Sequence, residues 1–219
     1  RGVHRSGGEV RKRRGGDVGE MSALTVCGGV GGEATFLRKA GFGKVTNSDF
    51  SENALEVCRE RDPGLETVWL NAESMDLGDA SHDVVVVQDG LHHLPRPVLG
   101  FNEMLRVAKK AVIVLEPHAG IAGKLLGREW EEHEGVFNYV FRWDGKLLEQ
   151  ATKSQVLKSP VIIESHPIWD HSGCVHKLVR SLGNGQLSLI AAKFIYACLT
   201  PLNFIGNNFI GIVIKHGEA

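Results

Sequence analysis

The stretch that decides the fold is Leu24-Thr-Val-Cys-Gly-Gly-Val-Gly-Gly-Glu-Ala-Thr-Phe-Leu37. A short apolar run enters a cluster of four glycines, and apolar residues at helical spacing follow the cluster. Glycines are needed at such a place because the turn is tight and a ligand must approach bare backbone. This order of strand, glycine turn and helix is typical of a nucleotide-binding α/β unit.

An acidic residue follows the glycine turn at a spacing typical of nucleotide-binding units. Asp49 lies eighteen residues past Gly31, at the end of a second short strand. An acidic residue about 20 residues past such a turn is placed to accept hydrogen bonds from ribose hydroxyls. Asp49 could also cap the helix that follows it, but its position at a strand end favours contact with ribose.

Strands and helices alternate along the first half of the chain. The pattern predicts helices over residues 33–40, 51–59 and 100–108, and strands over residues 44–48, 66–70, 83–88 and 111–116. The last two strands are apolar throughout, which is typical of strands covered on both faces. The alternation predicts the α/β class, with a Rossmann-like, doubly wound and mostly parallel sheet.

The regular alternation of strands and helices breaks down in the second half of the chain. Residues 120–160 are polar and aromatic, so we interpret them as an insertion or lid over the active edge. The sheet resumes over residues 161–165, helices follow near residues 175–182 and 187–199, and residues 209–215 form a late antiparallel strand, the seventh of the sheet. The most apolar window, residues 187–204, is interrupted by charge and proline and is too short to span a bilayer, which predicts a buried helix.

Polar residues stand at the ends of four apolar strands. Ligands of doubly wound sheets bind outside the carboxyl ends of the strands. By that rule one edge of the sheet is lined by Asp49, Asn71, Gln88, Asp89 and Glu116.

The composition favours one domain without a strongly charged partner. The chain has 219 residues, 42% of them hydrophobic, and a net charge of −1, so no global field attracts nucleic acid or an anionic membrane. Residues 21–219 are expected to form a single domain behind a flexible basic leader at residues 1–20. The four cysteines lack any C-x-x-C spacing, which indicates neither a disulfide framework nor a zinc site and fits a cytoplasmic protein without a secretory signal.

Four segments in order resemble the class I S-adenosylmethionine-dependent methyltransferases, in particular their small-molecule branch. The segments are the glycine turn at residues 26–31, the strand end at residues 47–51, the loop at residues 71–76 and the strand with its following loop at residues 83–97. The resemblance covers residues 24–117. It implies S-adenosyl-L-methionine as cofactor and methyl transfer to a small-molecule acceptor, without nucleic acid or membrane as partner; it leaves the oligomeric state unknown.

The resemblance also implies a set of cofactor-binding residues. They are Cys27, Gly28, Gly29, Gly31, Asp49, Phe50, Asn71, Ala72, Glu73, Gln88 and Asp89. The chain departs from the family pattern at Thr25, where the family usually has an acidic residue, and at Cys27, where it usually has a glycine. These departures keep open the alternative of a cofactor-binding module without catalysis.

A second alternative is an NAD(P)-dependent Rossmann oxidoreductase. The segment Gly29-Val-Gly-Gly-Glu-Ala34 also fits G-x-G-x-x-A, with Asp49 as the ribose acid. A Tyr-x-x-x-Lys proton-transfer pair is absent from the sequence, because neither Tyr139 nor Tyr196 has a lysine four residues on.

Candidates for catalysis and acceptor binding come from less specific signals. In the pair His92-His93 we expect one ring to pack and His93 to reach the cofactor edge; no cysteine or carboxylate cluster completes a metal set at ligand spacing, so no metal is expected. His171, beside an aspartate, is a second candidate base. Candidate acceptor residues are Glu116, His118, Trp130, Arg142 and Trp143.

Overall fold

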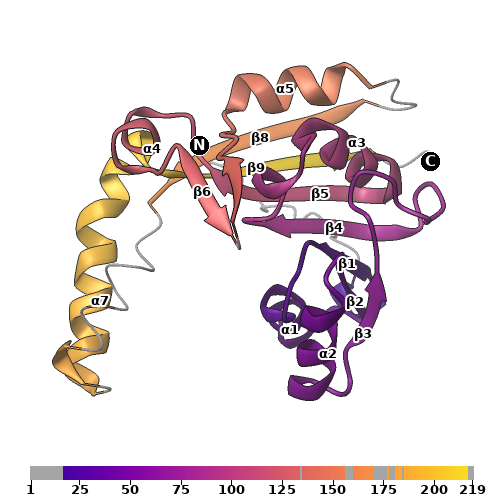
Figure 1. The fold of residues 1–219 in the computed structure, drawn as a ribbon, viewed down its shortest axis with the longest axis horizontal. Helices are drawn as coiled ribbons and strands as arrows, with labels where there is room; N and C mark the ends of the chain where they lie inside the picture. Colours follow the sequence, from indigo (N-terminus) through magenta and orange to yellow (C-terminus); the bar gives the residue numbers. More distant parts are fainter. Residues whose placement is uncertain are drawn as a thin grey trace, which may run out of the picture.

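The computed structural model describes residues 17–133, 135–155, 160–169, 177, 181–183 and 185–216. In these residues the chain forms a seven-stranded sheet with helices on both faces and, beside it, a two-stranded hairpin (Figure 1). The helix expected at residues 175–182 falls largely outside the described residues, as do most of the expected leader and His171.

The sheet is parallel except for one strand. Five parallel strands stand in the order β3-β2-β1-β4-β5, and β9 runs antiparallel between β5 and β8. Their bounds are β1 Ser22–Val26, β2 Lys44–Asp49, β3 Glu66–Trp69, β4 His82–Gln88, β5 Ala108–Pro117, β8 Val161–Ile168 and β9 Asn208–Lys215. The predicted doubly wound, mostly parallel sheet with a late antiparallel strand is confirmed.

Helices cover the two faces of this sheet because its central strands are apolar on both. In β4, Val85 and Val87 face one cluster of buried side chains, while Val84 and Val86 face the other. Helices α1 (Gly32–Lys39) and α2 (Glu52–Arg61) contribute to the second cluster, whereas α3 (Pro97–Val107) and α5 (Gly145–Lys153) contribute to the first.

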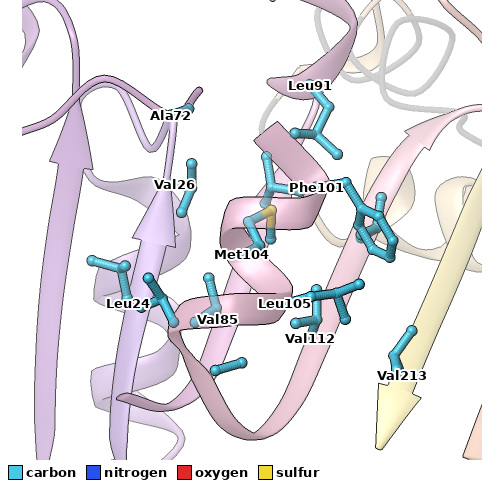
Figure 2. Packing of buried hydrophobic residues seen from close by; sticks show 14 of the residues in the cluster. Leu24, Val26, Ala72, Val85, Leu91, Phe101, Met104, Leu105, Val112 and Val213 are labelled. Carbon is cyan, nitrogen blue, oxygen red and sulfur yellow. The ribbon is translucent and has the colours of Figure 1, made fainter. Parts of the chain in front are cut away.

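The larger cluster lies between α3 and the middle of the sheet (Figure 2). Phe101 and Met104 of α3 are fully buried against Val85 and Val112. α3 begins three residues before its predicted start, at Pro97, because proline in the first helical turn sacrifices no hydrogen bond.

After β5 the chain forms a segment outside the sheet, and the two ends of this segment lie next to each other. The intervening excursion holds α4 (Ile121–Leu126) and a hairpin of β6 (Trp130–His133) and β7 (Val136–Tyr139). Its two ends are joined, because the Trp143 N–H donates to the Pro117 carbonyl and the Ala119 N–H donates to the Trp143 carbonyl, each at 2.8 Å. The following helix, α5, buries Leu148 in the core and so belongs to the sheet's cover.

The predicted buried helix near the C-terminus is exposed. Helix α7 (Gln186–Leu199) extends away from the sheet and continues into the 3-10 helix η3 (Thr200–Ile205) (Figure 1). Leu187 and Phe194 are 69% and 68% exposed. Within the described ranges, residues 186–205 are the one helical stretch long and apolar enough to cross a membrane, with mean hydropathy 1.5 and 11% of the window buried. Two expectations fail here. The stretch is not buried, because apolar composition does not determine which surface covers a helix. It is also not too short to span a bilayer, because the helix continues into η3 and reaches 20 residues.

Candidate functional site

The glycine turn after β1 adopts backbone conformations that side chains resist. Gly29 and Gly31 have φ angles of +51° and +84°, and Cys27 has a φ of +52°. A Cβ on Gly28 would lie 2.1 Å from Oδ1 of Asn47. The turn therefore needs glycine at Gly28 for space and at Gly29 and Gly31 for conformation, while Cys27 occupies the left-handed region at a cost.

A buried polar network supports the turn from behind. The Thr25 hydroxyl donates to Oδ1 of Asn47 at 2.7 Å, and Nδ2 of Asn47 donates to the Gly29 carbonyl at 3.0 Å. The Ser48 hydroxyl donates to the Thr25 carbonyl at 2.7 Å. Thr25 and these two β2 side chains are buried. The departure at Thr25 thus has a structural role, since its hydroxyl fixes the amide that holds the turn.

Asp49 connects the turn with the next helix. Its Oδ2 accepts the Gly29 N–H and its Oδ1 accepts the Ser51 N–H, each at 2.8 Å. The N-cap of α2 is Ser51, whose hydroxyl accepts the Ala54 N–H at 3.3 Å. Asp49 is therefore not the helix cap, and its carboxylate lies on the wall of a cavity.

The cavity has a volume of about 490 Å³ and lies at the carboxyl ends of β1, β2, β3 and β4. Its wall is formed by Cys27, Asp49, Phe50, Leu70, Asn71, Ala72, Glu73, Asp89, Gly90, His93, Leu94 and Pro95. Most of the residues predicted to bind the cofactor are brought together here, and so is His93. Leu70, Gly90, Leu94 and Pro95 were missed, because apolar loop residues carry no signal of their own.

Four predicted cofactor residues lie outside the wall. Gly28, Gly29 and Gly31 stand behind it and shape it through their backbone, and Gln88 is exposed beyond it. Gln88 was expected on the wall together with Asp89. Successive side chains of a strand point to opposite faces, so Gln88 and Asp89 point in different directions.

Glu73 lines the cavity but binds another residue. Its Oε1 accepts the Arg96 backbone N–H at 2.5 Å, and its Oε2 accepts Nε and Nη2 of Arg96 at 3.1 and 2.8 Å. These three hydrogen bonds tie the loop after β3 to the loop after β4. Glu73 therefore helps to hold the wall, and its contact with the cofactor stays a prediction.

An aromatic pair stands at the rim. Phe50 and Trp69 are 64% and 53% exposed, with ring centroids 4.9 Å apart. Nε1 of Trp69 donates to the Phe50 carbonyl at 2.8 Å, which fixes the pair. An exposed, oriented ring beside a cavity offers a flat apolar face to a ligand.

The thiol of Cys27 does not act as a nucleophile in this wall. Burial, together with the charges of Asp49 and Glu116, raises the pKa of Cys27 to about 12. A thiol with such a pKa is protonated at neutral pH.

Glu116, predicted to face the acceptor, is instead an internal anchor. It is fully buried, and Oε1 accepts the backbone N–H groups of Gly90 and Leu91 at 2.9 and 2.7 Å. Its Oε2 accepts the His92 N–H at 3.2 Å and lies 2.7 Å from Nδ1 of His92. This carboxylate shapes the loop that forms one side of the cavity, because it pairs with three successive backbone donors.

Of the two adjacent histidines, one is buried and the other lines the cavity. His92 is buried, and its side chain sits in the 3-10 helix η2 (Leu91–His93) against Glu116, while the His93 side chain is 42% exposed and lines the cavity. Burial alone would lower the pKa of His92, but the hydrogen bond to Glu116 and the charges of Glu116, Glu131 and Asp89 raise it.

Three further acceptor candidates are structural. Trp143 is fully buried against Phe101, so no acceptor reaches it. His118 is buried and its Nδ1 donates to the Gly206 carbonyl at 2.9 Å. Arg142 donates to the carbonyls of Gly123, Val140 and Arg128 and so fastens the base of the hairpin. The sequence suggested a lid for Arg142 and Trp143 and an acceptor contact for His118, but their polar and aromatic groups are occupied by backbone carbonyls and core packing.

The hairpin brings unpredicted residues to the site. Nδ2 of Asn138 donates to the His92 carbonyl at 2.7 Å, and Glu131 lies 3.8 Å from a ring nitrogen of both His92 and His93. Trp130, an acceptor candidate, is 56% exposed on the hairpin against Tyr139. Sequence could not place Glu131, because its position depends on how the hairpin docks.

A smaller cavity of about 160 Å³ adjoins this region. Its wall includes Asp89, Arg128, Glu131, Arg142 and Asn208. Asp89 lines both cavities, so a molecule in the larger cavity and one in the smaller would meet beside it.

The described fold and site resemble a known class of protein. Residues 24–115 match the family described as "Methyltransferase domain", the segment from β1 to β5 that carries the turn, Asp49 and the cavity loops. With the observed sheet order, this match makes the matched segment similar to the class I S-adenosylmethionine-dependent methyltransferases.

Particular relatives agree with this class. The demethylmenaquinone methyltransferase of Staphylococcus aureus strain MRSA252 is 35% identical over 151 residues, which cover 58% of this chain and 63% of the relative. That of strain JH9 is 34% identical over 149 residues, covering 57% and 62%. The match therefore spans less than two thirds of these relatives.

Solved structures share the fold at low identity. An S-adenosylmethionine-dependent methyltransferase from Mesorhizobium loti has a TM-score of 0.62 at 13% identity, covering 91% of this chain and 93% of that one. The cyclase SpnF has a TM-score of 0.56 at 16% identity, covering 90% and 76%. These likenesses show the fold alone, since a methyltransferase and a cyclase share it.

Proposed function

We propose that this chain transfers the methyl group of S-adenosyl-L-methionine to a small-molecule acceptor. The observation that carries the proposal is the cavity of about 490 Å³, whose wall unites Cys27 at the start of the glycine turn, Asp49 and the loops after β3 and β4. Its volume lies in the range of small-molecule sites. The match of residues 24–115 to the methyltransferase domain family supports the same activity.

The residues present fit that cofactor. Nothing lies within 4 Å of the place where a Cβ on Gly29 would stand, so in the proposal the turn offers bare peptide to the amino-acid end of the cofactor. In the proposal Asp49 accepts hydrogen bonds from the ribose hydroxyls, using lone pairs beside those that bind the Gly29 and Ser51 N–H groups. Phe50 covers one face of the adenine, and Asn71 and Ala72 lie along its edge.

The protein's contribution to the reaction is chiefly alignment. The bound cofactor supplies an electrophilic methyl group on a sulfonium, and holding two reactants in line lowers a barrier by about 7–11 kcal/mol. His93 lies on the cavity wall and is proposed to take a proton from the acceptor, worth on the order of 10²–10⁴-fold in rate.

Sheet order argues against the nicotinamide alternative. The usual dinucleotide-binding sheet has six parallel strands in the order 3-2-1-4-5-6, whereas here β5 is followed by the antiparallel strand β9. The remaining alternative, cofactor binding without catalysis, is favoured by no contact in the site.

Calorimetric titration tests the cofactor. We expect S-adenosylhomocysteine and S-adenosylmethionine to bind with one site per chain and NADH to give no heat. Tight binding of NADH with no response to the two sulfur nucleosides would refute the proposal.

Transfer itself is tested with labelled methyl groups. Because the relatives are named demethylmenaquinone methyltransferases, demethylmenaquinone in its reduced form is the first acceptor for the assay. Label in the extracted product supports turnover, and the Asp49→Ala variant serves as the control with impaired cofactor binding.

A further inference from the structure

We propose that His92, His93 and Glu131 form a binding site for a divalent metal ion of the zinc class, at the junction of the two cavities. The site goes beyond the proposed methyl transfer. It rests on side chains from two elements, η2 and β6, that the sequence keeps far apart.

The three donor atoms already stand close together. Oε2 of Glu131 lies 3.8 Å from Nε2 of His92 and 3.8 Å from Nδ1 of His93. All three donors lie within 4.8 Å of one another. Bonds of about 2.0–2.2 Å in a tetrahedral zinc site place donors about 3.3 Å apart, so small side-chain rotations are enough to enclose an ion.

His92 is prepared for coordination by a second carboxylate. Its Nδ1 lies 2.7 Å from Oε2 of Glu116, which is buried and accepts hydrogen bonds. Nδ1 therefore carries the hydrogen of this bond, and Nε2 on the opposite side of the ring presents its lone pair toward Glu131. A carboxylate bonded to the far nitrogen of a histidine is the arrangement that orients histidine ligands of zinc. This observation is independent of the donor distances.

The local charge also favours a cation. Two carboxylates flank His92, because Oε2 of Glu116 lies 2.7 Å from its Nδ1 and Oε2 of Glu131 lies 3.8 Å from its Nε2. The side chains of His93 and Glu131 are 42% and 28% exposed, so an ion can enter from solvent.

The position of the site suggests its use. His93 lines the larger cavity and Glu131 lines the smaller one. Two histidines and one glutamate leave a fourth tetrahedral position, which is how catalytic zinc sites admit a ligand. An acceptor hydroxyl placed there would be acidified by the ion, which would then replace His93 as the group that promotes loss of the acceptor's proton.

Titration of Zn²⁺ into the metal-free, full-length protein tests the site. We expect one tightly bound ion per chain, and affinity reduced at least about tenfold in Glu131→Gln and in His93→Ala. The matched control is Glu132→Gln on the same strand, which removes an exposed neighbouring carboxylate and leaves affinity unchanged. Co²⁺ in place of Zn²⁺ is expected to give the visible absorption of a tetrahedral site, absent in Glu131→Gln.

Two results would overturn the inference: no ion bound above the level of surface carboxylates, or equal affinity in wild type, Glu131→Gln and His93→Ala. Thermal unfolding of each variant checks that it is folded, and Glu131→Gln decides if His93→Ala is not. Titration of S-adenosylhomocysteine on the same samples separates the two proposals. A wild-type protein that binds the nucleoside but no zinc refutes the metal site alone, and one that binds zinc but no nucleoside refutes the cofactor assignment alone.

Discussion

At the scale of single residues, Asp49 has the most specific proposed role, which is contact with the ribose of the cofactor. Its carboxylate binds the glycine turn and lies on the cavity wall. The Asp49→Ala substitution is expected to weaken S-adenosylhomocysteine binding by about 1–3 kcal/mol, because a charged partner of hydroxyls is lost. Calorimetry measures the change, with Glu52→Ala as a control on the exposed start of α2. An unchanged dissociation constant would argue against ribose contact.

Cys27 offers a test of backbone strain. Its φ of +52° lies in the left-handed region, which costs a residue with a Cβ about 1–2 kcal/mol. We therefore expect Cys27→Gly to be more stable than Cys27→Ala by about 1 kcal/mol, the reverse of the order in ordinary backbone. Chemical denaturation of both variants gives the difference. Greater stability of the alanine variant would mean that the strain is absent.

Sequence predicted the residues of this site where a pattern marks them. The glycine turn and Asp49 follow from a spacing that the chemistry of nucleotide binding imposes. Glu116 was predicted at the right edge but in the wrong role, because sequence does not reveal that three N–H groups of the next loop turn toward it. Trp143 was misassigned because an aromatic residue in a polar segment can still face the core.

At the scale of elements, the loop after β4 depends on Glu116. Replacing this residue by glutamine sets an amide N–H₂ against donors that now meet a carboxylate. We expect Glu116→Gln to lower the free energy of unfolding by about 2–4 kcal/mol and to weaken nucleoside binding as the loop loosens. Denaturant titration and calorimetry measure the two effects. Full stability in the variant would show that water satisfies these donors.

Elements were predicted best where both faces of a strand are buried. Continuous apolar runs predict β4 and β5 as strands that are covered on both faces, so their order and their burial could be predicted from the sequence. Helix α5 was not predicted, because an amphipathic helix after a polar segment is recognised only from what it packs against. Helix α7 was predicted as a helix, but its exposure depends on tertiary context that the sequence does not show. The docking of the hairpin through Asn138 likewise leaves no mark in the sequence.

At the scale of the whole molecule, two carboxylates tie elements together and make stability depend on pH. Burial alone would raise the pKa of Asp83, but hydrogen bonds from Lys110 and Ser22 lower it from 3.8. The hydrogen bond from Arg106 is the main cause of a lowered pKa for Glu103, from 4.5. Both groups thus stabilise the fold above their ordinary pKa values, and this contribution is lost as pH falls through the lower, folded values.

The melting temperature is therefore expected to be level from neutral pH to about pH 5 and to fall below about pH 4.5. Calorimetric scans across this range measure it. The Asp83→Asn, Glu103→Gln double variant should melt lower at neutral pH and show a shallower acid slope. Identical acid slopes in the two proteins would contradict the linkage.

The central claim is that a sulfur-containing nucleoside lies across the carboxyl ends of β1, β2 and β4. A crystal structure with S-adenosylhomocysteine tests it most directly. The account predicts ribose hydroxyls within hydrogen-bond distance of Asp49, adenine against Phe50 and the sulfur facing His93. A nucleoside bound elsewhere, or ribose out of reach of Asp49, would contradict it.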